Sequence, residues 1–187
     1  MKILRELSKD NNFTGREGEI FLRRIIPNDC YYKTIRSLYL FDENGHTHQI
    51  DQLLIRPNGV FCIEVKNYKG VIYGKEHDER WLQKLGRETY SFYNPIKQNK
   101  VHKKVIEYNL SHQYKVVPLV VFIKNNISNI SCDNVISLKD FAKYVSTYKS
   151  DITLSNEDID NIFSIIALRA PKDITMKKHI ENIRKKV

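Results

Sequence analysis

The spacing of apolar positions changes several times along the first third of the chain. After Thr14, apolar residues recur at helical spacing, and a threonine three positions before Glu17 is typical of a helix start. The sequence therefore predicts a helix over 15–26. Runs rich in β-branched and aromatic residues, separated by turn signals, then predict strands. The predicted strands are 31–41, 46–56 and 60–66, and the last is apolar on both faces, which favours a central position in a sheet.

The rest of the chain predicts one more buried strand and several helices. Asn94 before Pro95 is a good helix opening, and this helix is expected to end near Leu110. The remaining predicted elements are a buried strand over 116–123, short strands near 71–73 and 81–82, helices that begin after Ser137 and Ser155, and a helix over 174–186. This order predicts an α/β fold with a mixed central sheet flanked by helices. Residues 1–135 should form the core, and 136–187 a helical C-terminal extension packed on it as one structural unit.

Two carboxylates are brought together by the predicted turn at Pro57 and Asn58. If these residues form the loop of a hairpin, the pairing runs outward until Asp51 lies opposite Glu64. Directly opposed side chains have Cβ atoms about 5 Å apart, and two like charges there repel unless a cation lies between them. A slip of one residue would put the two carboxylates on opposite faces.

Lys66 shares a face of its strand with Glu64, because the two residues are two positions apart. A lysine ammonium beside two carboxylates can orient a water and offset charge that builds on a phosphate. Mg²⁺ suits such a site because it takes oxygen ligands and keeps waters that can serve as nucleophile. The same residues, taken alone, also fit a surface ion-pair cluster.

Two helical residues are further candidates. Glu19 falls on the inward stripe of the first predicted helix with Leu22, and Gln98 falls on the stripe of Val101 and Val105 in a later helix. Glu19 is expected to support a metal, and Gln98 to contact the site or the scissile phosphate. Positions at the rim or edge of the core explain both residues equally well.

Positive charge is the strongest feature of the composition. The chain has 31 Lys and Arg residues against 22 Asp and Glu, which gives a net charge of +9, and its pI is near 9.4. Such a surface concentrates polyanions, of which nucleic acid is the commonest. Lys97, Lys100 and Lys104 form a basic row on one helix face that could bind phosphates, although a solvated helix face accounts for them too.

Several other classes of site are disfavoured. Cys30, Cys62 and Cys132 lack the spacing of a disulfide framework or a zinc site, so reduced thiols are expected. The six histidines also lack ligand spacing, and only His102, near Gln98, stands close to another candidate. No apolar run approaches the roughly 20 residues that span a bilayer, and the chain begins without a signal-type stretch. A cytoplasmic protein without membrane association is expected.

Four segments carry a resemblance to a known family. They are Gly15–Glu19, Gln49–Asp51, Gly59–Asn67 followed by Gly70, and Asn94–Asn99. In this order and at this approximate spacing they resemble the nuclease-related domain, or NERD, family over about residues 13 to 123. That family resembles the PD-(D/E)XK nuclease superfamily, which implies a restriction-endonuclease-like core. Ile50 stands where the superfamily's name has proline.

The resemblance also implies roles for the candidate residues. Asp51 matches the superfamily's aspartate, Glu64 and Lys66 its (D/E)XK pair, Glu19 the acidic residue of the first helix, and Gln98 a glutamine of a later helix. It implies an Mg²⁺- or Mn²⁺-dependent nuclease with Asp51, Glu64 and Glu19 as metal ligands. The expected partner is nucleic acid, with DNA expected ahead of RNA and the choice between them left open. A catalytically inactive nucleic-acid-binding module of the same fold is the alternative, and a homodimer stays open.

Overall fold

The structure, a computed structural model, describes residues 15–124 and 126–171. These residues form two compact units. The first unit consists of 15–29, 64–98 and 119–148, and the second of 30–63, 99–118 and 149–171. Each unit is described by itself below.

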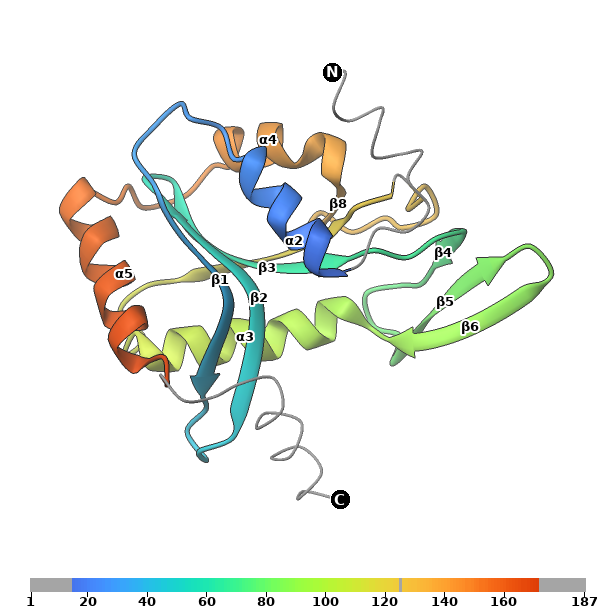
Figure 1. The fold of residues 1–187 in the computed structure, drawn as a ribbon, viewed down its shortest axis with the longest axis horizontal. Helices are drawn as coiled ribbons and strands as arrows, with labels where there is room; N and C mark the ends of the chain where they lie inside the picture. Colours follow the sequence, from blue (N-terminus) through green and yellow to red (C-terminus); the bar gives the residue numbers. More distant parts are fainter. Residues whose placement is uncertain (1–14, 125, 172–187) are drawn as a thin grey trace. The chain divides into compact units, whose positions relative to one another are not determined.

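The helices and strands follow one another along the chain as Figure 1 shows. They are α2 (Gly15–Arg24), β1 (Lys33–Phe41), β2 (Thr47–Arg56), β3 (Gly59–Lys66), β4 (Val71–Tyr73), β5 (Arg80–Leu85), β6 (Glu88–Tyr93), α3 (Pro95–Asn109), β7 (Val116–Phe122), β8 (Val135–Ser137), α4 (Leu138–Thr147) and α5 (Asn156–Arg169). One sheet has the order β1-β2-β3-β7-β8, and a second has the order β4-β5-β6. Because β1, β2 and β3 are antiparallel whereas β7 and β8 are parallel, the larger sheet is mixed, which confirms the predicted α/β class.

The second unit is built on the β1–β2–β3 meander. Arg56 pairs with Gly59 across the two-residue turn, and the register continues to Gln52 opposite Ile63, which confirms the predicted hairpin. Apolar residues of these strands form one core with residues of α3 and α5. The core includes Leu53, Ile55, Val60, Cys62, Val105, Ile106, Ile159, Ile162 and Ile166. Burial of such residues is the main source of stability in the unit.

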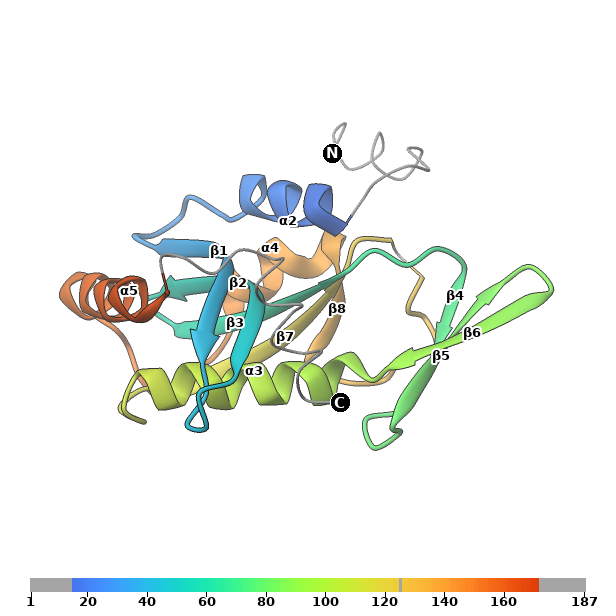
Figure 2. The same ribbon diagram turned by 60° about the horizontal axis from the view of Figure 1, so that its bottom comes forward.

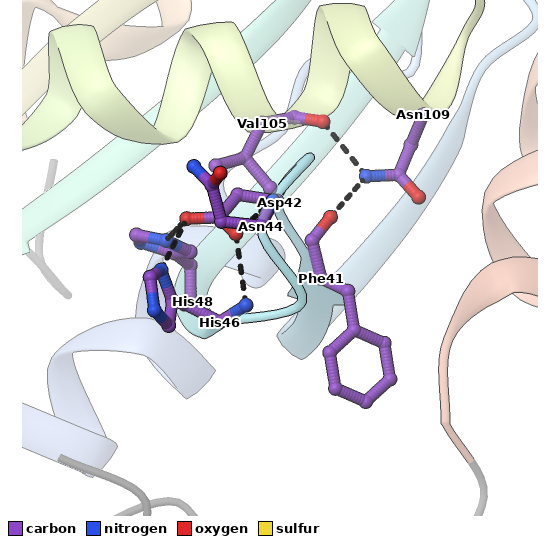
Figure 3. A network of polar contacts seen from close by, with 7 residues as sticks. All are labelled: Phe41, Asp42, Asn44, His46, His48, Val105 and Asn109. Atoms are coloured by element: carbon purple, nitrogen blue, oxygen red, sulfur yellow. Dashed lines mark hydrogen bonds and ion pairs between the residues drawn. The ribbon is translucent and has the colours of Figure 1, made fainter. Parts of the chain in front are cut away.

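The turn between β1 and β2 is organised by the Asp42 carboxylate (Figure 3). Its Oδ1 accepts hydrogen bonds from the backbone N–H groups of Asn44 at 3.0 Å and His46 at 2.8 Å. Its Oδ2 lies 3.2 Å from His46 Nδ1 and 3.0 Å from His48 Nε2. Burial raises the pKa of Asp42, but the bonds from His48 and from the turn outweigh it and hold that pKa below its ordinary value.

Asn109 joins the last turn of α3 to the end of β1. Its Nδ2 donates to the carbonyl oxygens of Phe41 and Val105, each at 2.8 Å (Figure 3). The side chain is buried, so both bonds replace water that the two carbonyl groups would otherwise need. One amide group therefore closes the helix end and anchors the strand.

One hydrophobic cluster of the first unit is built around Trp81 of β5. Its fully buried indole packs with Phe122 of β7, with ring centroids 6.3 Å apart, and its Nε1 donates to the Lys75 carbonyl at 3.0 Å. Gly74 lies against the indole so closely that an added Cβ would be 2.3 Å from two of its carbons. Only glycine fits there. The loop between β4 and β5 therefore folds directly over the tryptophan.

Asn94 joins that same loop to the start of α3. Its Oδ1 accepts from the backbone N–H of Ile96 at 2.9 Å, which confirms the predicted cap. Its Nδ2 donates to the carbonyls of Lys75, Glu76 and Asp78 at 3.3, 3.0 and 2.7 Å. The side chain is completely buried. The cap residue thus also fixes the loop that covers Trp81.

Some predicted elements differ from those observed. The first helix ends at Arg24, two residues before its predicted end. The strand near 81–82 extends over Arg80–Leu85, and β6 and β8 were not predicted. β6 is mostly exposed and β8 has three residues, so neither shows a clear apolar pattern. The α5 capping box is confirmed. The predicted helix over 174–186 and the Thr14 cap lie outside the described residues.

Candidate active site

Lys66 joins a strand carboxylate to a helix amide in the first unit. Its Nζ lies 2.6 Å from Glu64 Oε1 and donates to Gln98 Oε1 at 3.0 Å. Glu64 and Lys66 come from the end of β3, and Gln98 from the first turn of α3. The structure therefore brings together three of the five residues singled out in the sequence.

The backbone fixes where these side chains lie. Alternation along β3 puts Glu64 and Lys66 on one face and Val65 on the other. Val65 faces α2, where a Cβ added to Gly18 would lie 3.4 Å from the valine side chain. The Lys66 carbonyl accepts from the N–H of Ile123 at 2.9 Å, so the lysine backbone is held as well.

Burial makes the pair of charges unusual. The Glu64 side chain is 2% exposed and that of Lys66 is 16% exposed. A carboxylate out of water is costly unless it is paired and hydrogen-bonded, and a charge-assisted bond to an ammonium is among the strong ones. This cluster can hold an ammonium at a defined place beside a carboxylate. An ammonium in that position is suited to orient a water or to offset charge on a phosphate oxygen.

Asp51 belongs to the second unit and is partly buried on β2. In the β1–β2 register Arg36 pairs with Gln52 and Leu38 with Ile50, and Ser37 between them adopts a φ of 47°. Non-glycine residues rarely adopt such a φ, and departures of this kind cluster at functional sites. The predicted position of Asp51 opposite Glu64 stays a prediction, because the recorded β2–β3 pairs run from Arg56 to Gln52.

The remaining candidates are Glu19 and the predicted lysine row. Glu19 lies on α2, but its side chain is outside the described residues. Of the predicted basic row, Lys97 is bound to Glu79 at 2.6 Å, while Lys100 and Lys104 are exposed. The expected apolar stripe of Gln98 is wrong at Val101, which is exposed. Gln98 instead contacts Lys66 from the first turn of α3.

The donor chemistry fits a hard divalent cation. Asp51 and Glu64 offer carboxylate oxygens, which Mg²⁺ and Mn²⁺ prefer as ligands. Across 15–124 and 126–171, no group of three His, Cys, Asp or Glu side chains is arranged to hold a metal ion. The side chain of Glu19, the third predicted ligand, lies outside the described residues.

One polar cluster was not predicted from the sequence. Asp42, His46 and His48 meet at the β1–β2 turn, where the spacing D-x-x-x-H-x-H was the available signal. His102 is buried, with its ring centroid 6.3 Å from that of His48. Lys104 and Tyr108 of α3 line a nearby cavity of about 410 Å³. Two of the six histidines thus contact one carboxylate.

All three cysteines lie in the described part of the chain. Cys30, Cys62 and Cys132 carry thiols, not disulfides. Cys62 donates its Sγ–H to Asn99 Oδ1 at 3.0 Å, and Asn99 Nδ2 donates back to the Cys62 carbonyl at 2.9 Å. The pair fastens β3 to α3 within the second unit.

Comparison with known proteins adds the family. The family model described as the nuclease-related domain matches residues 14–123. The chain belongs to the nuclease-related domain family. All five candidate residues, from Glu19 to Gln98, fall inside the matched part, whereas β8, α4 and α5 follow it.

Two individual proteins are similar to this nuclease-related domain protein over most of their length. An uncharacterized protein of Bacillus anthracis is 33% identical over 182 residues, which cover 92% of this chain and 84% of the relative. Among solved structures, the small subunit of a heterodimeric restriction endonuclease aligns with a TM-score of 0.38 and 14% identity, covering 98% of this chain and 94% of that subunit. A likeness at this level does not indicate activity. In the described residues, no helix is both long and apolar enough to cross a membrane.

Proposed function

We propose that this nuclease-related domain protein is a metal-dependent nuclease that hydrolyses phosphodiester bonds in nucleic acid. The observation that carries the proposal is the buried Glu64 carboxylate bound to Lys66, which is bound in turn to Gln98. The two partners come from β3 and α3 and hold the ammonium in one place, as a lysine that acts on a reacting group requires.

Each residue of the cluster has a task in this proposal. Lys66 Nζ orients the attacking water and offsets charge on the phosphate, while Gln98 Oε1 fixes the position of that Nζ. Asp51 and Glu64, with Glu19, would hold Mg²⁺ or Mn²⁺, which when bound supplies a Lewis acid and lowers the pKa of its water. For Asp51 the proposal rests on the hairpin register and the family match.

The expected substrate follows from charge. A net charge of +9 draws polyanions to the protein, and Lys100 and Lys104 lie exposed on α3, where they could contact phosphates. DNA is the first substrate to test and RNA the second.

A cleavage assay on the full chain tests the proposal. Single-stranded and duplex DNA and RNA of one sequence are incubated with Mg²⁺, Mn²⁺ or EDTA, and the products are separated on a denaturing gel. Cleavage should require the metal and fall about 100-fold or more in Lys66→Ala and Asp51→Ala, since each loses a group that acts on the reacting atoms. Lys139→Ala, an exposed lysine of α4, is the matched control and should cleave like wild type.

Two outcomes would contradict the proposal. Equal cleavage by all four proteins would mean a contaminant or a different site. Binding that weakens steeply with salt, without cleavage of any substrate, would identify the inactive nucleic-acid-binding module instead.

A further inference from the structure

The small sheet of the first unit has one face packed and one face open. Its strands are antiparallel, with Tyr73 opposite Leu82 and Arg80 opposite Tyr93. Trp81 and Phe92, which pair with each other, point into the core of the unit. Alternation along the strands puts six large side chains on the other side, which we call the outer face. They are Val71, Tyr73, Arg80, Leu82, Lys84 and Tyr93.

The outer face is apolar to an unusual degree. Tyr73, Leu82 and Tyr93 are 40%, 44% and 43% exposed, and Val71 is exposed beside them. The solvated face of an antiparallel sheet normally carries polar residues, and contiguous exposed apolar groups mark interaction sites. Figures 1 and 2 show the three strands side by side, with the β5–β6 hairpin running on beyond β4. The face is therefore a surface for a ligand.

The charges on the outer face are all positive. Arg80 and Lys84 are exposed on β5, and the two smaller residues of the face, Thr89 and Ser91, are uncharged. The Arg80 guanidinium lies along the sheet, because its Nε donates to Ser91 Oγ at 3.1 Å and its Nη2 to the Ser91 carbonyl at 3.0 Å. A second copy of the same face would be repelled. An anion is attracted.

A hollow adjoins this face. A cavity of about 440 Å³ is lined by Tyr73, Arg80 and Leu82 from the strands and by Lys75 and Asp78 from the loop. The Asp78 carboxylate accepts from the Lys75 backbone N–H at 2.8 Å, so it is engaged by the loop. The hollow thus offers one aromatic ring, one aliphatic side chain and two cations, beside the Asp78 carboxylate and Asn129.

We propose that the outer face binds single-stranded nucleic acid, with bases stacked on Tyr73 and Tyr93 and phosphates on Arg80 and Lys84. Aromatic rings interleaved with cations are the arrangement that sequence-tolerant single-strand binding uses. A duplex hides the faces of its bases, so it cannot stack in this way. The inference rests on the proposed function, for which it names the strand state of the substrate.

The outer face belongs to the same unit as the Lys66 cluster. Asn94 holds the loop that contains Lys75, and its carbonyl accepts from the N–H of Gln98 at 3.1 Å in the first turn of α3. The loop beside the outer face is thus hydrogen-bonded to the helix start that positions Lys66.

Binding to the full chain in EDTA tests the inference without cleavage. Fluorescence anisotropy of a labelled single-stranded oligonucleotide is compared among wild type, Tyr73→Ala, Tyr93→Ala and Tyr90→Ala. Tyr90 is the matched control, because it pairs with Gln83 on the opposite face of the same hairpin and is 49% exposed. Tyr73→Ala and Tyr93→Ala should each weaken binding about 5- to 100-fold, and Tyr90→Ala about 2-fold at most. Lys84→Ala should lower the slope of log affinity against log salt by about 0.7.

Three results would overturn the inference. The first is equal affinity of Tyr73→Ala, Tyr93→Ala and Tyr90→Ala. The second is that Tyr73→Ala and Tyr93→Ala weaken the binding of a duplex of the same sequence as much as they weaken the binding of the single strand. The third is unchanged nucleic acid binding with a shift from dimer to monomer in light scattering, which would make the outer face a contact between copies. Circular dichroism verifies that each variant is folded.

The two proposals fail separately. If Lys66→Ala loses cleavage while the tyrosine variants bind and cleave like wild type, only the outer face is refuted. If single strands bind through Tyr73 and Tyr93 but no metal supports cleavage, only the nuclease proposal is refuted.

Discussion

Strands β3 and β5 differ in the burial of their charged residues. Every residue of β3 from Gly59 to Val65 is buried, and its carboxylate, Glu64, is bound to Lys66. In β5, buried Trp81 alternates with exposed neighbours, and the cations Arg80 and Lys84 lie in solvent. A charge inside a sheet has partners that the fold dictates, whereas a charge on an open face is available to a ligand. We therefore assign the proposed chemistry to β3 and the proposed binding to β5.

Neighbouring residues of β5 give the largest expected contrast. Trp81→Ala should lower the free energy of unfolding by about 3–5 kcal/mol, because it removes the side chain around which a hydrophobic cluster of the first unit is built. Leu82→Ala, one position along on the outer face, should change it by less than about 1 kcal/mol. Urea unfolding followed by circular dichroism measures both. Similar losses in the two variants would show that the outer face is packed in solution.

Lysines from the two strands give the next contrast. Lys66→Met should destabilise the protein by about 3 kcal/mol at pH 7, because the buried Glu64 carboxylate loses its ammonium. Lys84→Met removes an exposed lysine of the outer face and should change stability by no more than about 0.5 kcal/mol. Thermal and urea melts compare the two. If Lys66→Met is as stable as Lys84→Met, the pair with Glu64 does not stabilise the fold.

The smallest effect is expected at the solvent end of the larger sheet. Asp42→Asn should cost about 1–2 kcal/mol at pH 7, because the charged carboxylate is hydrogen-bonded to His46 and His48. The folded pKa of Asp42 lies below the ordinary 3.8, so its contribution is complete above about pH 4 and is lost as the pH falls below 3.8. Unfolding at pH 7, 5 and 3 should show the difference between variant and wild type shrinking only at pH 3.

Asp151→Asn is the control for that series. Asp151 is exposed in the loop before α5, so its replacement should have no measurable effect on stability at any of the three pH values. If Asp42→Asn lowers the free energy of unfolding as much at pH 3 as at pH 7, the turn depends on the shape of the Asp42 side chain and not on its charge.

Local patterns explain why much of the larger sheet was predictable. The strands β1 and β2 contain β-branched, aliphatic and aromatic residues among polar ones, β3 is an almost continuous apolar run, and the tight turn at Pro57 and Asn58 sets the register that follows. The same pattern placed Glu64 and Lys66 on one face. Periodicity inside single segments was sufficient for all of these features.

Contacts between distant segments could not be read in this way. Gln98 was expected to contact the site, but helical periodicity did not identify its partner, Lys66, which lies 32 positions earlier. The strand β6 was missed because most of its residues face solvent, and the outer face exists only once three strands are paired. The Asp42 cluster needed the turn geometry that brings two histidines to one carboxylate. Pairing across space, more than local propensity, decides these features.

Asn94 has a consequence for how the first unit opens. One buried side chain closes the 75–78 loop, begins α3 and lies in the segment that leads to Gln98. Segments that share their hydrogen bonds in this way exchange their amide protons together, as one cooperative unit. We therefore expect the loop over Trp81 and the first turn of α3 to open together, because Asn94 links both to each other.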